Sequence, residues 1–144
     1  MSLFTVAPDG QDLKRVSADS VVADTPRWSP DGTRIAFRTE EPGNPYAPTD
    51  LRLYTVGEGT RSIIDRQEGP VQSAHWIDGE RLAVALADHG ETVLAEVSVS
   101  EGSVTETDSG SYLPHSTRVH AAGERFVAVL SQPSTPGETG RPLL

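Results

Sequence analysis

Residues 28–37 have the sequence Trp28-Ser29-Pro30-Asp31-Gly32-Thr33-Arg34-Ile35-Ala36-Phe37. This stretch predicts the end of one β-strand, a tight turn and the start of a second strand. A proline at the second position of a β-turn presets φ near about −65°, and the Asp-Gly pair after it tolerates the backbone angles of a tight turn. Beyond the turn, Ile35 and Phe37 alternate with polar or small residues, which is the period of a half-buried strand. The stretch therefore predicts a β-hairpin.

The same hairpin recurs twice along the chain. A second copy lies at 76–84, with one turn residue fewer, and a third, which we align from Val119, has lost the tryptophan, proline and aspartate. A strand-like phrase precedes each copy, at 3–6, 51–56 and 92–99. A repeat of about 40–45 residues that carries about four short strands is typical of β-propeller blades.

The sequence therefore predicts one all-β domain over 1–144, a partial β-propeller of about three four-stranded antiparallel blades. Since closed propellers usually have four to eight blades, we expect a segment of a larger protein, or strand edges that pair with another molecule, including self-association. The predicted repeats and connections are, in order, 3–38, a proline-rich loop at 39–50, 51–85, 92–130 and a loop-like tail at 131–144.

Composition excludes several classes of function. The formal net charge is −9, and an acidic surface opposes binding to nucleic acid or to an anionic membrane. The chain has no cysteine, which excludes disulfides and thiolate metal sites. No apolar run approaches the roughly 20 residues of a membrane span, and no signal peptide precedes the first strand. We expect a cytoplasmic location.

The proline-rich loop holds the candidate contact residues. Long loops on rigid scaffolds often carry function, and this loop and its flanks contribute three acids and one aromatic side chain. A solvated loop without a binding role is the alternative. The candidate residues are Glu40, Glu41, Tyr46 and Asp50.

The hairpin residues themselves are interpreted as structural. Trp28 and Trp76 occupy equivalent places in a repeat, which favours the core between blades over the lining of a binding pocket. The turn residues match turn chemistry, and a calcium site would need several more oxygen ligands. The turn residues are Pro30, Asp31, Gly32, Asp78 and Gly79.

No catalytic, cofactor-binding or metal-binding residue is predicted. A metal site built from histidine would need a third ligand that the sequence does not place, so structural or surface roles are favoured. The histidines are His75, His89, His115 and His120.

Residues 28–37 closely resemble the blade motif of TolB-type propellers, and the repeats are TolB- or WD-like. The motif is shared by the propellers of prolyl-oligopeptidase-family serine peptidases. Leu53-Tyr54-Thr55-Val56 resembles that family's outer-strand phrase. The segment 126–138 resembles the late propeller of its acylaminoacyl-peptidase-like and dipeptidyl-aminopeptidase-like members.

This resemblance implies two alternative functions. The first is the propeller of a serine peptidase, which gates or filters peptide substrates for a hydrolase domain. The nucleophile elbow G-x-S-x-G of such a domain is absent from this sequence, so we expect no enzymatic activity from the chain itself. The second is a TolB-like module that binds protein or peptide partners, which would imply a periplasmic location. An inert fragment is a third possibility.

Overall fold

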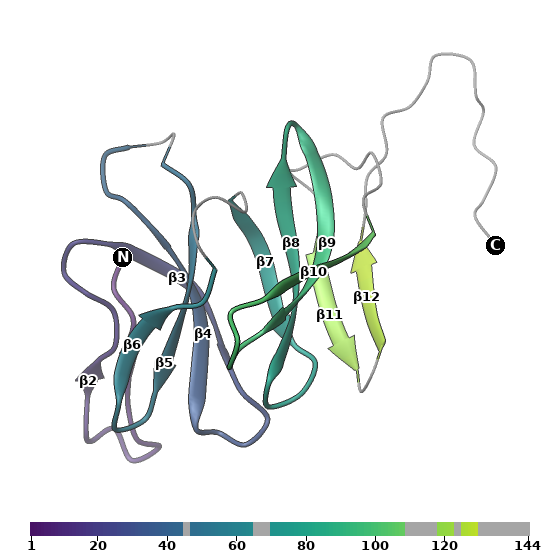
Figure 1. The fold of residues 1–144 in the computed structure, drawn as a ribbon. Coiled ribbons are helices and arrows are strands. Elements are labelled where there is room, and N and C mark those ends of the chain that lie inside the picture. The colour runs from purple at the N-terminus through teal and green to yellow at the C-terminus, as the bar shows by residue number, and fades with distance from the viewer. Residues whose placement is uncertain (45–46, 65–69, 109–117, 123–124, 130–144) are drawn as a thin grey trace, which may run out of the picture.

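The computed structural model describes residues 1–44, 47–64, 70–108, 118–122 and 125–129. Throughout these ranges the regular elements are all β-strands, paired into two four-stranded and two two-stranded antiparallel sheets (Figure 1). The all-β architecture predicted from the sequence is confirmed. Nowhere in the same ranges is there a helix long and apolar enough to cross a membrane.

The two four-stranded sheets are complete blades that lie side by side (Figure 1). Each is a meander in which consecutive strands pair. The first blade contains β3 (Val22–Trp28), β4 (Arg34–Glu40), β5 (Asp50–Thr55) and β6 (Gly59–Ser62). The second contains β7 (Val71–Trp76), β8 (Arg81–Asp88), β9 (Glu91–Ser98) and β10 (Val104–Asp108).

The remaining strands form two isolated hairpins, one at each end of the described chain. The first pairs β1 (Phe4–Thr5) with β2 (Lys14–Arg15), and the last pairs β11 (Arg118–Ala122) with β12 (Arg125–Val129). The sheets are thus offset by one hairpin from the repeats drawn at 3–38, 51–85 and 92–130. A periodic sequence fixes the length of a repeat but leaves open which neighbouring hairpins share hydrogen bonds, and here the first two central hairpins pair with the outer strands that follow them.

The central strands are buried on both faces. In β4, Ile35 and Phe37 pack into a cluster with the N-terminal hairpin, whereas Ala36 faces the cluster shared with the second blade. All three side chains are almost completely buried. The half-buried strand expected from the alternation is therefore covered on its small-residue face as well, because a second blade packs there.

The turn at 29–32 is stabilised by hydrogen bonds from its own residues. The amide of Gly32 donates to the carbonyl of Ser29 at 2.9 Å, which places Pro30 at the second turn position, and Gly32 has a φ of 71°. The Asp31 carboxylate accepts hydrogen bonds from the Ser29 hydroxyl at 2.6 Å and from the Thr33 amide at 3.0 Å. These bonds lower the pKa of Asp31 to about 2, because they favour the charged form.

The shorter turn of the second blade uses a similar aspartate. Asp78 accepts hydrogen bonds from the amides of Glu80 at 2.8 Å and Arg81 at 2.9 Å, and the Arg81 guanidinium reaches its second oxygen at 2.7 Å. The backbone bond from Glu80 is the largest effect, and together these bonds lower the pKa of Asp78. The aspartate of each turn therefore holds its own loop closed.

Strand pairing corrects the alignment of the third repeat. Trp28 pairs with Ile35, and Trp76 pairs with Leu82. In the last hairpin the residue opposite Phe126 is Ala121. Ala121, and not Val119, therefore stands at the tryptophan position. The Gly-Glu-Arg run at 123–125 repeats the run at 79–81, but the turn before it is one residue shorter, so the sequence without its tryptophan did not fix the offset of the first strand.

The two tryptophans have different environments. Trp76 is buried, and its indole Nε1 donates a hydrogen bond of 2.9 Å to the carbonyl of Arg27 in the first blade. Trp28 is 52% exposed. Trp76 thus lies between the two blades. Among the described residues no inner strand covers the equivalent side of the first blade, so Trp28 is exposed there, and its place between blades stays a prediction.

Candidate functional site

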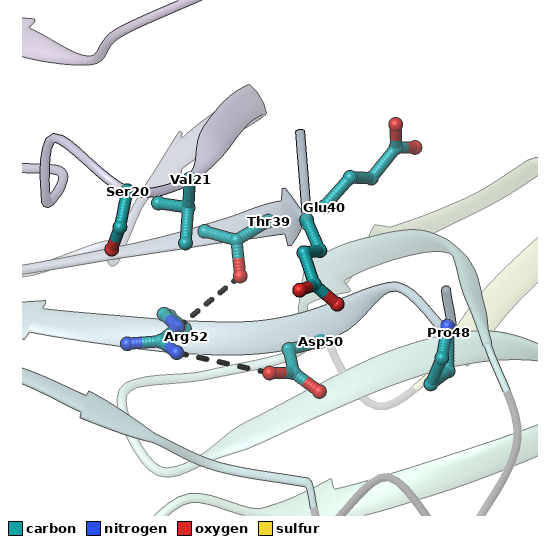
Figure 2. Close-up of a pocket in the computed structure, with 8 residues that line it drawn as sticks. Ser20, Val21, Thr39, Glu40, Pro48, Asp50 and Arg52 are labelled. Carbon is teal, nitrogen blue, oxygen red and sulfur yellow. Dashed lines mark hydrogen bonds and ion pairs between the residues drawn. The ribbon is translucent and has the colours of Figure 1, made fainter. Parts of the chain in front are cut away.

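A small pocket opens at one end of the first blade, beside the proline-containing connection between β4 and β5 (Figure 2). Its volume is about 250 Å³. Its walls come from the chain just before β3, the end of β4, the start of the connection and the first residues of β5. The lining residues are Ser20, Val21, Thr39, Glu40, Glu41, Pro48, Asp50 and Arg52.

The antiparallel pairing of β4 with β5 sets the geometry of the pocket. Thr39 lies opposite Asp50 in this pair, and both residues are buried. The Arg52 Nε donates a hydrogen bond to the Thr39 hydroxyl at 3.2 Å, and its Nη2 lies 3.8 Å from the Asp50 Oδ2. Figure 2 shows these two contacts as dashed lines across the floor of the pocket. Arg52 is therefore held in place by groups on both strands.

The pocket has a net negative character. The lining contains three carboxylates, from Glu40, Glu41 and Asp50, and one guanidinium, from Arg52. Glu40 and Glu41 are exposed at the rim, whereas the Asp50 side chain is only 8% exposed. Carboxylates near a surface attract cationic groups, and partial burial reduces the screening of that attraction by salt. The arrangement suits an ammonium or guanidinium group better than an anion.

Three of the four predicted contact residues line this pocket. Glu40, Glu41 and Asp50 come together there, while Tyr46 lies outside the described residues. The predicted loop at 39–50 was drawn too wide, because Thr39 and Glu40 end β4 and Asp50 begins β5. Asp50 is thus a buried strand residue and not an exposed loop residue: the hydrogen-bonded ladder continues past the point where the composition changes.

Sequence reasoning missed Arg52 and the two residues before β3. Arg52 is a charged residue between Leu51 and Leu53, both fully buried, so it lies on the opposite face of β5. That alternation was a usable signal. Ser20 and Val21 approach the pocket only because β3 pairs with β4, and no local feature of the sequence reports this pairing.

The histidines do not assemble a site where the chain is described. The Nδ1 of His75 lies 3.1 Å from the carbonyl oxygen of Trp76, and His89 contacts its neighbour Asp88 on the surface. His115 lies outside the described residues. Among the described residues, no group of three or more histidine or acidic side chains is arranged to hold a metal ion.

The fold defined by these blades is that of a β-propeller, of which this chain forms a part. A solved structure with the same arrangement is TolB from Acinetobacter baumannii, with a TM-score of 0.64 and 18% sequence identity. The match covers 83% of this chain and 29% of the TolB chain. The chain thus spans less than a third of that protein, and at this identity the similarity shows the fold.

Puromycin hydrolase also appears among the similar solved structures. Its TM-score is 0.44 at 17% identity, and the match covers 83% of this chain and 27% of that chain. No protein-family model matches the sequence.

Proposed function

We propose that this chain is a propeller module that binds a protein or peptide partner, and that the acidic pocket on the first blade receives a cationic group of that partner. The observation that carries the proposal is the charge of the pocket, whose lining contains three carboxylates and one guanidinium that is held by Thr39 and Asp50. A cationic side chain or an amino terminus of the partner would replace water molecules at these carboxylates and donate charge-assisted hydrogen bonds to them.

The position of the pocket supports this proposal. It lies where a connection leaves the rigid blade, and connections on rigid scaffolds are common binding elements. The net charge of −9 adds a long-range attraction for basic partners, which raises their association rate. Because Arg52 repels a cation from the floor of the pocket, the cationic group of a partner would contact Glu40 and Glu41 at the rim.

The proposal is tested with two blocked pentapeptides, Gly-Ser-Arg-Gly-Ser and Gly-Ser-Ala-Gly-Ser. Isothermal titration calorimetry is used to measure their binding to the 144-residue chain at 50 mM and 300 mM salt. We expect the arginine peptide to bind with a Kd on the order of 1 mM, with weaker binding at high salt. We expect the alanine peptide to bind at least tenfold more weakly, as expected for the loss of a charge-assisted contact.

Two variants of equal charge locate the binding site. Glu40→Gln removes an acid at the rim of the pocket, and Glu106→Gln removes an exposed acid on β10. The first should weaken binding of the arginine peptide about three- to tenfold, and the second should leave it unchanged. Equal affinity for the two peptides, or equal effects of the two variants, would overturn the proposal.

A role in gating peptide access to a hydrolase domain is the alternative from the sequence resemblance, and it remains a prediction. The segment 126–138, which most favoured this alternative, lies largely outside the described residues. Sequencing the complete reading frame tests it directly. A G-x-S-x-G elbow on a strand-to-helix turn in the adjoining sequence would support the gating role, and its absence would remove the basis for it.

A further inference from the structure

The described chain contains two half blades in addition to its two complete ones. β1 and β2 pair only with each other, and so do β11 and β12. A complete blade of this protein has four strands in sequential order. Each half therefore has one strand edge free for further pairing among the described residues, which is an arrangement that proteins usually cover.

The two halves correspond to different parts of a blade. Leu3-Phe4-Thr5-Val6 in and around β1 matches Leu53-Tyr54-Thr55-Val56 of the third strand of the first blade. By register, β12 matches the second strand, because Phe126 is placed like Ile35 and Leu82. The N-terminal hairpin is thus an outer half and the C-terminal hairpin an inner half, and together they have the strand order of one complete blade.

The two halves of a single copy cannot meet. Figure 1 shows the N-terminal hairpin with β2 at one side of the molecule and β11 and β12 at the other, with both complete blades between them. Pairing of the halves therefore requires two molecules.

Exposed apolar residues mark the surfaces that a complete blade would cover. Val127 on β12 is 66% exposed, whereas Ala36 and Ala83, which occupy the same register position in the complete blades, are 1% and 0% exposed. Trp28 is 52% exposed, whereas its equivalent Trp76 is 5% exposed. Trp76 on β7 closes the seam between the two complete blades by packing against β3. Trp28 is the equivalent residue on β3, so it lies where one more inner strand would pack against the first blade.

We propose that a second copy of this chain supplies that strand. The hairpin β11–β12 of one copy pairs through β12 with β1 of the other and completes a blade. By the register of Arg34 with Thr55 and of Arg81 with Ser98, Arg125 lies opposite Thr5 of the other copy. Trp28 then donates its indole hydrogen bond to the carbonyl of His120, the residue equivalent to Arg27.

The contact is head to tail, and a second identical contact closes the pair. Two copies would contribute four complete blades and two composite ones, about six in all, within the usual range of four to eight for a closed propeller. In a closed pair every β1 and every β12 is paired on both sides, whereas an open assembly of copies leaves one β1 and one β12 without this pairing at its ends, which is the physical reason to prefer closure.

The first test measures the mass in solution, by size-exclusion chromatography with light scattering at 150 mM salt. The chain has a mass of 15.4 kDa, and we expect a species of twice that mass. Trp28→Ala should convert it to single copies that keep the circular dichroism of a β protein, since Trp28 is exposed in a single copy. Thr105→Ala is the matched control, because Thr105 is exposed on β10, the outer strand of a complete blade.

The second test fixes the register. The natural chain has no cysteine, so Thr5→Cys and Arg125→Cys can be made in separate chains and mixed under mild oxidation. We expect a disulfide-linked pair from this mixture, and none when Thr105→Cys, on β10, replaces Thr5→Cys. A single-copy mass for the natural chain, a mass that keeps growing with concentration, an unchanged mass for Trp28→Ala, or equal cross-linking of the two mixtures would each overturn the proposal.

Discussion

Asp31 is a side chain that contributes to the pH dependence of stability. Its carboxylate accepts hydrogen bonds from the Ser29 and Thr33 hydroxyls and from the Thr33 amide. These bonds favour the charged form and lower the pKa from 3.8 to about 2 in the folded chain. The group therefore stabilises the fold at a pH above its unfolded pKa, and this stabilisation is lost as the pH falls from about 4 through 2.

Replacement of Asp31 tests this linkage. In Asp31→Asn, the midpoint of urea unfolding should be lower than in the natural chain at pH 5, and the two midpoints should converge toward pH 2. Thr33→Val removes one hydroxyl donor and keeps the carboxylate, so it should give an intermediate pH dependence. A constant difference between Asp31→Asn and the natural chain from pH 5 to pH 2 would contradict this account.

At the residue scale, the sequence predicted what depends on near neighbours. The turn positions of Pro30 and Gly32 followed from backbone preferences within four residues. The exposure of Trp28 did not, because burial of a blade residue depends on whether another strand packs against it. Asp50 was assigned to a loop for a similar reason: its neighbours in the chain are loop-like, but its partner Thr39 lies in the adjacent strand.

The turn is the element that connects the sequence repeat to the fold. Gly32 and Gly79 occupy similar turns, and a Cβ built on either would meet no atom within 4 Å. Of these two glycines, only Gly32 has a positive φ, of 71°. Because neither position is crowded, a difference between alanine variants at the two positions reports backbone strain alone.

Gly32→Ala should destabilise the chain by about 1–2 kcal/mol, because an L-residue is strained in the left-handed region. Gly79→Ala is the matched control and should change the free energy of unfolding by less than about 0.5 kcal/mol. Urea unfolding followed by circular dichroism measures both values. Equal losses in the two variants would show that the backbone conformation at residue 32 is not the cause.

The local sequence did not show which neighbouring hairpins belong to the same blade. The chain repeats a central hairpin and an outer pair, and either neighbour of a hairpin offers a strand of suitable pattern. Hydrogen bonding between β4 and β5 settles the choice across the proline-containing connection. Likewise, the pocket forms from four segments that share no local signature, so its acids were predicted as a loop and its Arg52 was missed.

At the scale of the whole molecule, the blades are held together by side chains that reach across the seam. Arg38 binds the Asp24 carboxylate within its own blade at 2.7 and 2.8 Å, and its Nη1 donates to the carbonyls of Val71 and Gln72 in the next blade at 3.2 and 2.9 Å. Burial alone would raise the pKa of Asp24, but the hydrogen bond and charge of Arg38 outweigh it and lower the pKa.

Arg38→Met should therefore cost about 2 kcal/mol, since it removes the guanidinium that binds the partly buried Asp24 carboxylate and two backbone carbonyls. Arg34→Met is the control, because the Arg34–Glu80 ion pair also joins the blades but Glu80 is 55% exposed, so its loss should cost less than about 1 kcal/mol. Urea unfolding by circular dichroism compares them. An Arg38 variant no less stable than the Arg34 variant would contradict this role.

The unequal tryptophans have a spectroscopic consequence. The chain has two of them, one sealed in the seam between blades with its indole hydrogen-bonded and one in contact with water. In a single copy their emission therefore comes from two distinct environments, a blue-shifted component from Trp76 and a red-shifted component from Trp28 that a dissolved quencher such as iodide can reach. Pairing of two copies as proposed would cover Trp28, so the fraction of emission that iodide quenches should fall as the pair forms.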